Sequence, residues 1–204
     1  MPSLPPVTKA LMLICTAVFL LDPGLLGRPI VPLVPWFALW PTGSGYFLPW
    51  QVVSYAFLHG SITHLFFNMF GLWMFGSELE RLWGTRRYLE VLLASAVSAA
   101  AVQLLFTLLT GSHAPTVGAS GALFGLLLSF GMLFPNRVIM PLFPPIPMKA
   151  RTFVAVFGGL ELLFGLTGGD GVAHFAHLGG MLGAWLMILY WRGKLPFGGP
   201  RRRR

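Results

Sequence analysis

Val-Gly-Ala-Ser-Gly-Ala-Leu-Phe-Gly, residues 117–125, opens an apolar stretch that continues to Phe134. Glycines at 118, 121 and 125 surround the hydroxyl of Ser120, so another helix can approach it closely. The backbone N–H groups of the first helical turn lack partners inside the helix and lie at the positive end of its dipole. Ser120 is therefore a candidate nucleophile whose oxyanion would meet donors already in position. The same small residues are also typical of two closely packed membrane helices.

The composition indicates a membrane protein. Of 204 residues, 55% are hydrophobic and only 10% are charged, and the mean hydropathy is +0.74. Too few polar residues are available to cover a soluble domain, so we expect an integral membrane protein. The single cysteine, Cys15, lies in an apolar run, which excludes a disulfide framework and a thiolate metal site. We expect neither a metal nor a cofactor.

Six windows are apolar enough to cross the bilayer: 8–27, 61–79, 88–110, 117–134, 148–167 and 172–192. Crossing about 30 Å of hydrocarbon takes about 20 helical residues. No small-residue cleavage site follows the first window, so we interpret it as a retained helix and not as a signal sequence. The sequence predicts an all-α bundle of six transmembrane helices, with residues 1–204 in one membrane domain.

The basic residues favour one orientation of this bundle. With a cytoplasmic N-terminus, 13 of the 14 lysines and arginines fall on the cytoplasmic side, and only Arg28 falls outside. This distribution follows the positive-inside rule. We therefore expect both termini in the cytoplasm, with residues 193–204 as a basic tail. The net charge of +8 then reflects topology, and no nucleic-acid partner is expected.

Two connections are rich in proline. Residues 28–60 carry five prolines among several aromatic side chains, so this outer loop cannot be one straight helix. Its amphipathic rings favour a position partly within the outer leaflet. Residues 135–149 also carry five prolines and are expected to form a rigid cytoplasmic connection.

Polar side chains occur inside two further windows. His64 and Asn68 share one helix face in the second window, and His174 and His177 lie near the start of the sixth. Polar groups in a bilayer are costly and often functional, although each histidine could instead join two helices by a hydrogen bond. At 1.5 Å per residue, His64, Ser120 and His177 start about 5–8 Å inside the outer ends of their windows. Helix packing alone does not require polar side chains from three windows to lie at the same depth in the membrane.

These residues resemble the rhomboid family of intramembrane serine proteases. The similarity rests on His-x-x-x-Asn at 64–68, Gly-x-Ser-Gly at 118–121 and Ala-His-x-x-Gly at 176–180. Glu-Arg-Leu-Trp-Gly at 80–84, Trp-Gln at 50–51 and the proline-rich fourth connection add to it. The motifs follow the family's order over residues 30–192. One departure is Ala184, where the family often has glycine.

The resemblance implies a serine endopeptidase that cleaves peptide bonds in or beside the transmembrane helices of other membrane proteins. Ser120 would be the nucleophile and His177 its general base, while His64, Asn68 and Gly118 would bind the oxyanion or the substrate. It further implies substrate helices that unwind easily, have a small residue before the cleaved bond and enter between the second and fifth spans. The expected location is the bacterial inner membrane, with the site open to the extracytoplasmic side.

The choice between the two histidines of the sixth window favours His177. Gly179 and Gly180 would clear the surface that meets Gly118 and Gly121, whereas His174 lies one turn nearer the outer surface. We expect His174 to line the water entrance or to orient its neighbour. Glu161 starts about 9 Å inside the fifth window and receives no catalytic role. The resemblance implies a Ser-His dyad, and the sequence agrees that no third acid helps, because the remaining acids lie at window ends or on the cytoplasmic side.

Two other functions use the same features. A catalytically inactive rhomboid-like protein could bind and escort membrane clients, but the presence of both Ser120 and His177 argues against it. A small transporter could use these polar groups, but the two halves of the chain show no repeat and no broken pair of helices at mid-depth.

Overall fold

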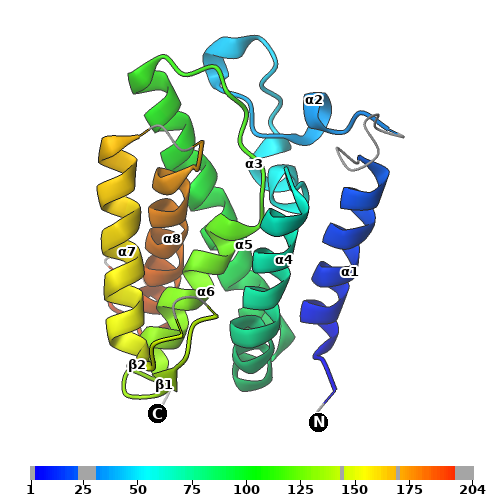
Figure 1. Ribbon diagram of the computed structural model, residues 1–204. Coiled ribbons are helices and arrows are strands. Elements are labelled where there is room, and N and C mark those ends of the chain that lie inside the picture. Colours follow the sequence, from blue (N-terminus) through cyan, green and yellow to red (C-terminus); the bar gives the residue numbers. More distant parts are fainter. Residues whose placement is uncertain (1–2, 23–30, 143–144, 169–170, 196–204) are drawn as a thin grey trace.

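The computed structural model describes residues 3–22, 31–142, 145–168 and 171–195. Its long helices lie side by side, and the start of α1 and the end of α8 lie at the same end of the molecule (Figure 1). These helices are α1 Pro6–Leu21, α4 Ile62–Gly71, α5 Ser77–Thr110, α6 Ser120–Leu133, α7 Ala150–Thr167 and α8 His174–Trp191. Between α1 and α4 the chain forms short helices α2 Val34–Phe37 and α3 Gln51–Ser54, with 3-10 turns at Thr42–Ser44 and Tyr55–Phe57.

The second and third expected spans form one nearly continuous helical segment. A π-helical turn, Leu72–Gly76, joins α4 to α5. The chain reverses inside α5 at Gly84, whose φ of 73° and ψ of 167° are not helical. Glycine adopts positive φ without the steric penalty that other residues pay. Residues 85–110 therefore run back along the molecule, as the two separate windows predicted (Figure 1).

Two helical segments of the described chain, Ile62–Thr110 and Ala150–Thr167, are both long and apolar enough to cross a membrane. Helices α1 and α6 are apolar but shorter. The first window was expected to extend to residue 27, but α1 ends at Leu21, and residues 23–27 lie outside the described part. Most of the expected basic tail, residues 196–204, also lies outside it.

Helix α8 packs most extensively against α5 and α6. A Cβ on Gly180 would lie 1.8 Å from the carbonyl oxygen of Gly121, so the backbones of α8 and α6 are in direct contact there. This confirms the expected pairing of Gly180 with Gly121. The prediction for Gly179 is wrong, because this residue faces α5, where a Cβ would lie 2.9 Å from the Ser98 carbonyl oxygen. Ala184 is fully buried in the core, so the alanine is accommodated.

Glu80 attaches α1 to the rest of the bundle. Its carboxylate accepts hydrogen bonds from the backbone N–H groups of Val7 and Thr8, at 2.9 and 2.7 Å, and from the Thr8 hydroxyl at 2.8 Å. The carboxylate thus satisfies the free N–H groups at the start of α1 and complements its dipole.

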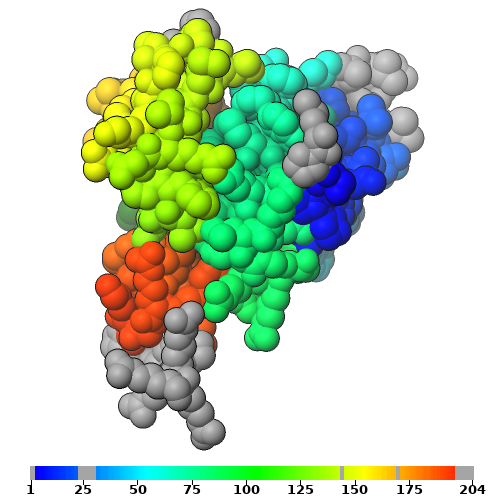
Figure 2. Space-filling model, turned by 90° about the horizontal axis from the view of Figure 1, so that it is seen from below, coloured from blue at the N-terminus to red at the C-terminus, as the bar shows by residue number. Residues whose placement is uncertain are grey.

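The proline-rich fourth connection contains two short strands that the all-α prediction did not include. Strands β1 Val138–Ile139 and β2 Met148–Lys149 pair antiparallel. This connection lies on the same face of the molecule as the start of α1 and the end of α8 (Figure 2). The described chain is otherwise helical between its loops, as the sequence predicted.

Candidate active site

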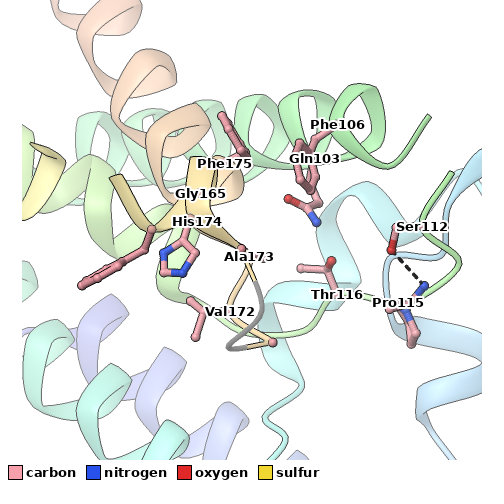
Figure 3. Close-up of a pocket in the computed structure, with 14 residues that line it drawn as sticks. Gln103, Phe106, Ser112, Pro115, Thr116, Gly165, Val172, Ala173, His174 and Phe175 are labelled. Atoms are coloured by element: carbon pink, nitrogen blue, oxygen red, sulfur yellow. Dashed lines mark hydrogen bonds between the residues drawn. The ribbon is translucent and has the colours of Figure 1, made fainter. Parts of the chain in front are cut away.

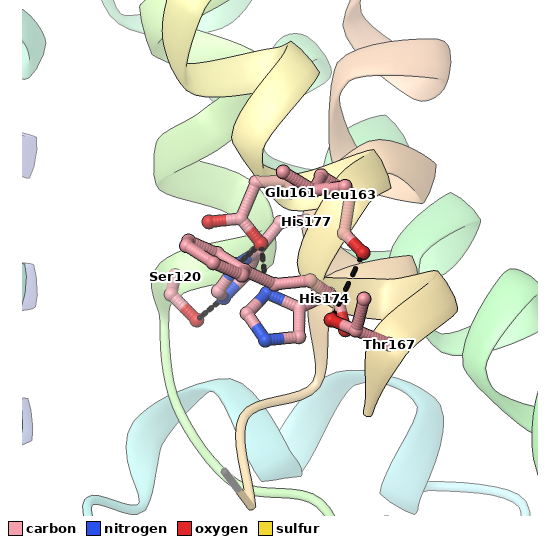
Figure 4. Close-up of polar contacts among 7 residues, drawn as sticks. Ser120, Glu161, Leu163, Thr167, His174 and His177 are labelled. Carbon is pink, nitrogen blue, oxygen red and sulfur yellow. Dashed lines mark hydrogen bonds and ion pairs between the residues drawn. The ribbon is translucent and has the colours of Figure 1, made fainter. Parts of the chain in front are cut away.

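Ser120 and His177 are in direct contact across the α6–α8 interface. The Ser120 hydroxyl oxygen lies 2.7 Å from Nε2 of His177 (Figure 4). Ser120 is the first residue of α6, and His177 lies one turn into α8. The contact between Gly121, which directly follows Ser120, and Gly180, one turn after His177, sets the close approach of the two helices. A hydroxyl that can donate to an imidazole nitrogen at this distance has the geometry of a nucleophile with its general base.

The segment before Ser120 differs from the predicted helix. The window at 117–134 was expected to be helical throughout, but residues 111–119 descend into the molecule as a loop and α6 begins only at Ser120 (Figure 1). Leu39 and Thr116 exchange backbone hydrogen bonds of 2.9 Å, and Gly118 N–H donates to the Tyr55 carbonyl at 2.9 Å. These bonds satisfy backbone groups that a helix would otherwise pair internally. Hydropathy alone does not separate the two conformations.

Gly118 and His64 form one wall of the site. Gly118 has a φ of 123°, and a Cβ there would lie 2.6 Å from His64 Nε2 and 3.6 Å from Ser120 Oγ. The His64 imidazole therefore lies against the backbone beside the serine hydroxyl. Because the N–H of Gly118 is already bonded to Tyr55, this glycine contributes space for His64 and not a free donor. The expected part of Gly118 in binding the oxyanion or the substrate stays a prediction.

Asn68 lies one turn below His64 on α4 and is buried. Its side-chain nitrogen donates to the His64 backbone carbonyl at 2.9 Å, and within the described residues its side-chain oxygen has no partner. The amide has a second N–H that this bond does not use. The structure thus brings His64 close to the serine, while the amide of Asn68 bonds to the His64 backbone.

His59 packs edge-on against His64, with ring centroids 5.1 Å apart. Burial, together with a smaller contribution from the nearby His64, lowers the pKa of His59 to about 4. His59 is therefore neutral at pH 7 and adds no positive charge beside the site.

Glu161 of α7 reaches the same histidine from the other side. Its Oε2 lies 2.7 Å from Nδ1 of His177 and 2.7 Å from Nδ1 of His174 (Figure 4). The prediction that no acid is available to His177 is therefore wrong. The depth estimates were consistent with a Glu161–His177 contact, because these residues start about 9 and 7.5 Å inside the outer ends of their spans. Sequence alone did not show that α7 turns Glu161 toward α8.

Aromatic contacts fix the His177 ring. Phe124, one turn after Ser120 on α6, stacks on it with centroids 4.4 Å apart and planes inclined by 7°. The ring is 8% exposed, whereas Ser120 is only half-buried. The imidazole is thus held in one plane while the hydroxyl stays accessible.

A cavity of about 260 Å³, lined in part by polar side chains, opens beside this cluster. His174, Gln103 and Thr116 face it together with residues of the loops that precede α6 and α8 (Figure 3). Its volume accommodates several water molecules at about 30 Å³ each. His174 lines the cavity and contacts Glu161, and its expected role at the water entrance or in orienting its neighbour stays a prediction.

Glu161, His174 and His177 also have the residue types of a metal site. The nitrogen–oxygen distances of 2.7 Å are those of hydrogen bonds. Two ligands on one tetrahedral zinc, each about 2.1 Å from the ion, would lie about 3.4 Å apart. The observed arrangement is that of two imidazoles sharing a carboxylate.

The family model described as the Rhomboid domain matches residues 47–194, which include all of these side chains. The chain belongs to the rhomboid family. This membership confirms the resemblance drawn from the three motifs.

Individual rhomboid relatives agree with this assignment. The chain is 31% identical over 190 residues to rhomboid protease GlpG of Yersinia pestis (strain Pestoides F), covering 91% of this chain and 62% of the relative. It is also 31% identical over 170 residues to presenilin-associated rhomboid-like protein A, mitochondrial, of Danio rerio, covering 80% of this chain and 44% of the relative. The chain thus spans less than two thirds of the length of these curated relatives.

Proposed function

We propose that this rhomboid chain is an intramembrane serine endopeptidase that hydrolyses peptide bonds in or beside transmembrane helices of membrane-protein substrates. The observation that carries the proposal is the 2.7 Å contact between Ser120 Oγ and His177 Nε2 at the start of α6. In this role Ser120 is the nucleophile and His177 the general base.

The reaction follows from the contact. His177 Nε2 takes the Ser120 hydroxyl proton as Oγ bonds to the substrate carbonyl carbon, and the carbonyl oxygen becomes an oxyanion. The resulting imidazolium then protonates the leaving amine, and the peptide C–N bond breaks. Water then attacks the acyl-enzyme and gives its proton to His177. His177 passes this proton to Ser120 Oγ as the acyl C–O bond breaks, which releases Ser120. The adjoining cavity of about 260 Å³ supports a supply of this water.

The oxyanion would be held by the backbone N–H of Ser120 and by His64. The N–H at the first position of α6 has no partner within the helix and lies at its positive end. His64 approaches from the Gly118 side, and the second N–H of Asn68 would support it. Losing one such donor typically costs about 2.7–4 kcal/mol of transition-state stabilisation.

The membrane arrangement belongs to the same proposal. We place the chain in a bacterial inner membrane as a single six-span domain, with both termini cytoplasmic and the site opening outward. The positive-inside distribution supports this orientation. The shared location of the α1 start, the fourth connection and the α8 end also supports it (Figures 1 and 2).

Substrate helices would enter laterally between α4 and α7. Both helices present large apolar side chains to the outside, including Phe66 and Phe67 on α4 and Leu162, Leu163 and Leu166 on α7. Only Ala150 and Phe153 of α7 are buried, so this helix is lightly held along most of its length. A substrate helix with a small residue before the cleaved bond, unwinding near the outer surface, would reach Ser120.

The test is cleavage of a generic transmembrane substrate by the purified protein in detergent. Wild type should cleave it, and Ser120→Ala should remove cleavage without unfolding the protein. Ser129→Ala is the matched control, because Ser129 is buried on the same helix and its hydroxyl donates to the Gly125 carbonyl. Cleavage that persists in Ser120→Ala would refute the role of this serine. Binding of the substrate without cleavage by wild type would instead favour the inactive client-binding protein.

A further inference from the structure

We propose that Glu161 is the positioning residue of a Ser120–His177–Glu161 triad, and that His174 holds its carboxylate in place. This inference rests on the proposed protease function and extends it beyond a dyad. The three contacts that carry it are each 2.7 Å long: Ser120 Oγ to His177 Nε2, His177 Nδ1 to Glu161 Oε2, and His174 Nδ1 to Glu161 Oε2.

The first consequence concerns the tautomer of His177. A neutral imidazole has one nitrogen that donates and one that accepts. An ionised Glu161 can only accept, so it places the proton of His177 on Nδ1 and leaves Nε2 as an acceptor for the Ser120 hydroxyl. The opposite tautomer would point an N–H at the serine and could not remove its proton. Glu161 thus selects the reactive form of the base.

The second consequence concerns charge during the reaction. When Nε2 takes the serine proton, His177 becomes an imidazolium in a site where its ring is 8% exposed and stacked on Phe124. An unpaired charge at such a position is costly. A carboxylate bonded to Nδ1 offsets the new positive charge and keeps the ring in the orientation that reaches Oγ. Soluble serine proteases use their buried aspartate in the same way.

His174 supplies the second donor to the carboxylate. Its Nδ1 contacts the same Oε2 as His177, and its ring packs against Phe164 of α7 with centroids 5.8 Å apart. A glutamate side chain has several rotatable bonds, and one contact would leave it free to swing away from His177. Two donors from successive turns of α8 fix its position, so His174 acts through Glu161 and not on the substrate.

The backbone of α7 is shaped for this contact. Gly165 lies one turn after Glu161, and a Cβ there would lie 3.0 Å from Phe175 and 3.3 Å from the His174 Cβ. Glycine therefore allows α7 to approach α8 at the level where the carboxylate must reach both histidines. Few other residues of α7 are buried. The alternative is that Glu161 merely tethers a lightly held helix, and the experiment must separate the two roles.

The experiment compares Glu161→Gln with wild type in two assays. The first measures kcat and KM on the transmembrane substrate. The second measures the rate at which a small fluorophosphonate modifies Ser120: Oγ bonds to phosphorus, fluoride leaves, and His177 takes the proton. The small reagent does not depend on lateral entry of a helix, so a mere tether would not change this rate. The amide of glutamine is similar in size to the carboxylate but cannot offset the imidazolium charge.

We expect Glu161→Gln to lower kcat and the fluorophosphonate rate by at least about 100-fold, with KM within about threefold of wild type. Removal of the corresponding charge in a soluble triad costs about 10⁴-fold. Glu161→Asp keeps the charge on a shorter side chain and should recover at least about tenfold over Glu161→Gln. Glu90→Gln is the matched control. Like Glu161, Glu90 is bonded to a ring nitrogen of an α8 side chain, because the Trp191 indole N–H donates to it at 3.0 Å. That variant should behave as wild type.

A normal fluorophosphonate rate in Glu161→Gln, with or without a raised KM, would overturn the triad and leave only a tether. If Glu161→Gln does not fold, Glu161→Asp decides the question. A kcat at least about fivefold below wild type at similar KM supports the proposal, and an unchanged kcat overturns it. Loss of activity only in the presence of a chelator would show a metal role and would also overturn it. The proposed function fails separately, because it requires cleavage by wild type.

Discussion

At the scale of single residues, Gly118 determines how closely His64 can approach the nucleophile. Its φ of 123° is strained for any other residue, and a Cβ would lie 2.6 Å from the His64 ring. Any side chain at this position would displace His64 from the oxyanion that it is proposed to bind. The glycine is therefore required for chemistry as well as for backbone conformation.

We expect Gly118→Ala to lower kcat by at least tenfold and the free energy of unfolding by about 1–2 kcal/mol. Gly45→Ala is the matched control, because Gly45 also has positive φ, 79°, but a Cβ there would meet nothing within 4 Å. It should lose similar stability and keep its kcat. Thermal unfolding in detergent together with steady-state cleavage measures both effects. Equal kcat in the two alanine variants would contradict the role of the His64 contact.

At the scale of elements, a carboxylate from another helix anchors the start of α1. Glu80 is 3% exposed and accepts three hydrogen bonds from Val7 and Thr8. Arg81, its neighbour, donates to the Ser3 carbonyl at 2.8 Å. The Glu-Arg-Leu-Trp-Gly motif thus connects the start of α1 to the turn at Gly84, at the opposite end of the bundle from the outer loop (Figure 1).

We expect Glu80→Ala to lower the stability of the protein by about 2–4 kcal/mol, because three N–H and O–H donors lose a charged acceptor. The kcat per folded molecule should stay within about twofold of wild type, because this end of the bundle is remote from Ser120. Circular dichroism melting and cleavage at a temperature well below the transition measure the two quantities. An unchanged melting temperature would contradict the anchoring role.

The elements also show how far sequence reasoning extends. Apolar windows long enough to cross a bilayer predicted α7, α8 and the two helices that meet at Gly84. They did not predict that α6 starts at Ser120 and not at Val117. That difference depends on long-range partners, since the Gly118 N–H bonds to Tyr55 and Thr116 pairs with Leu39. Such partners do not appear in a local window.

The candidate site was predictable where its motifs are local. Depth and spacing brought Ser120 and His177 to one level, and the structure places them in contact. Glu161 was recognised as an ionisable group within a span, but its partners depend on the rotation of α7 about its own axis. That rotation follows from the close approach of Gly165 to α8, a contact between distant parts of the chain.

At the scale of the whole molecule, the proposed function requires one orientation of the protein in the membrane. Cys15 is the single cysteine and is 2% exposed. Cysteines introduced elsewhere can therefore report on the topology while Cys15 stays in place. Tyr46 in the outer loop and Val138 on β1 are 61% and 64% exposed. They belong to loops at opposite ends of the bundle.

In spheroplasts, an impermeant maleimide should label Tyr46→Cys at once and Val138→Cys only after the membrane is opened. The positive-inside distribution is the physical reason for this order. Wild type, with Cys15 buried, is the unlabelled control. Labelling of both positions from the outside would contradict the six-span arrangement, and the reverse order would contradict the orientation.

In the proposed mechanism His177, and not its neighbour His174, removes the proton of Ser120. The direct measurement is kcat for His177→Ala and His174→Ala on one transmembrane substrate, with melting curves to show that both variants are folded. Because Nε2 of His177 contacts Oγ while His174 acts only through Glu161, His177→Ala should keep essentially no activity. His174→Ala should keep at least about a tenth of wild-type kcat, because the His177–Glu161 contact remains. Full loss in His174→Ala with substantial activity in His177→Ala would contradict the account.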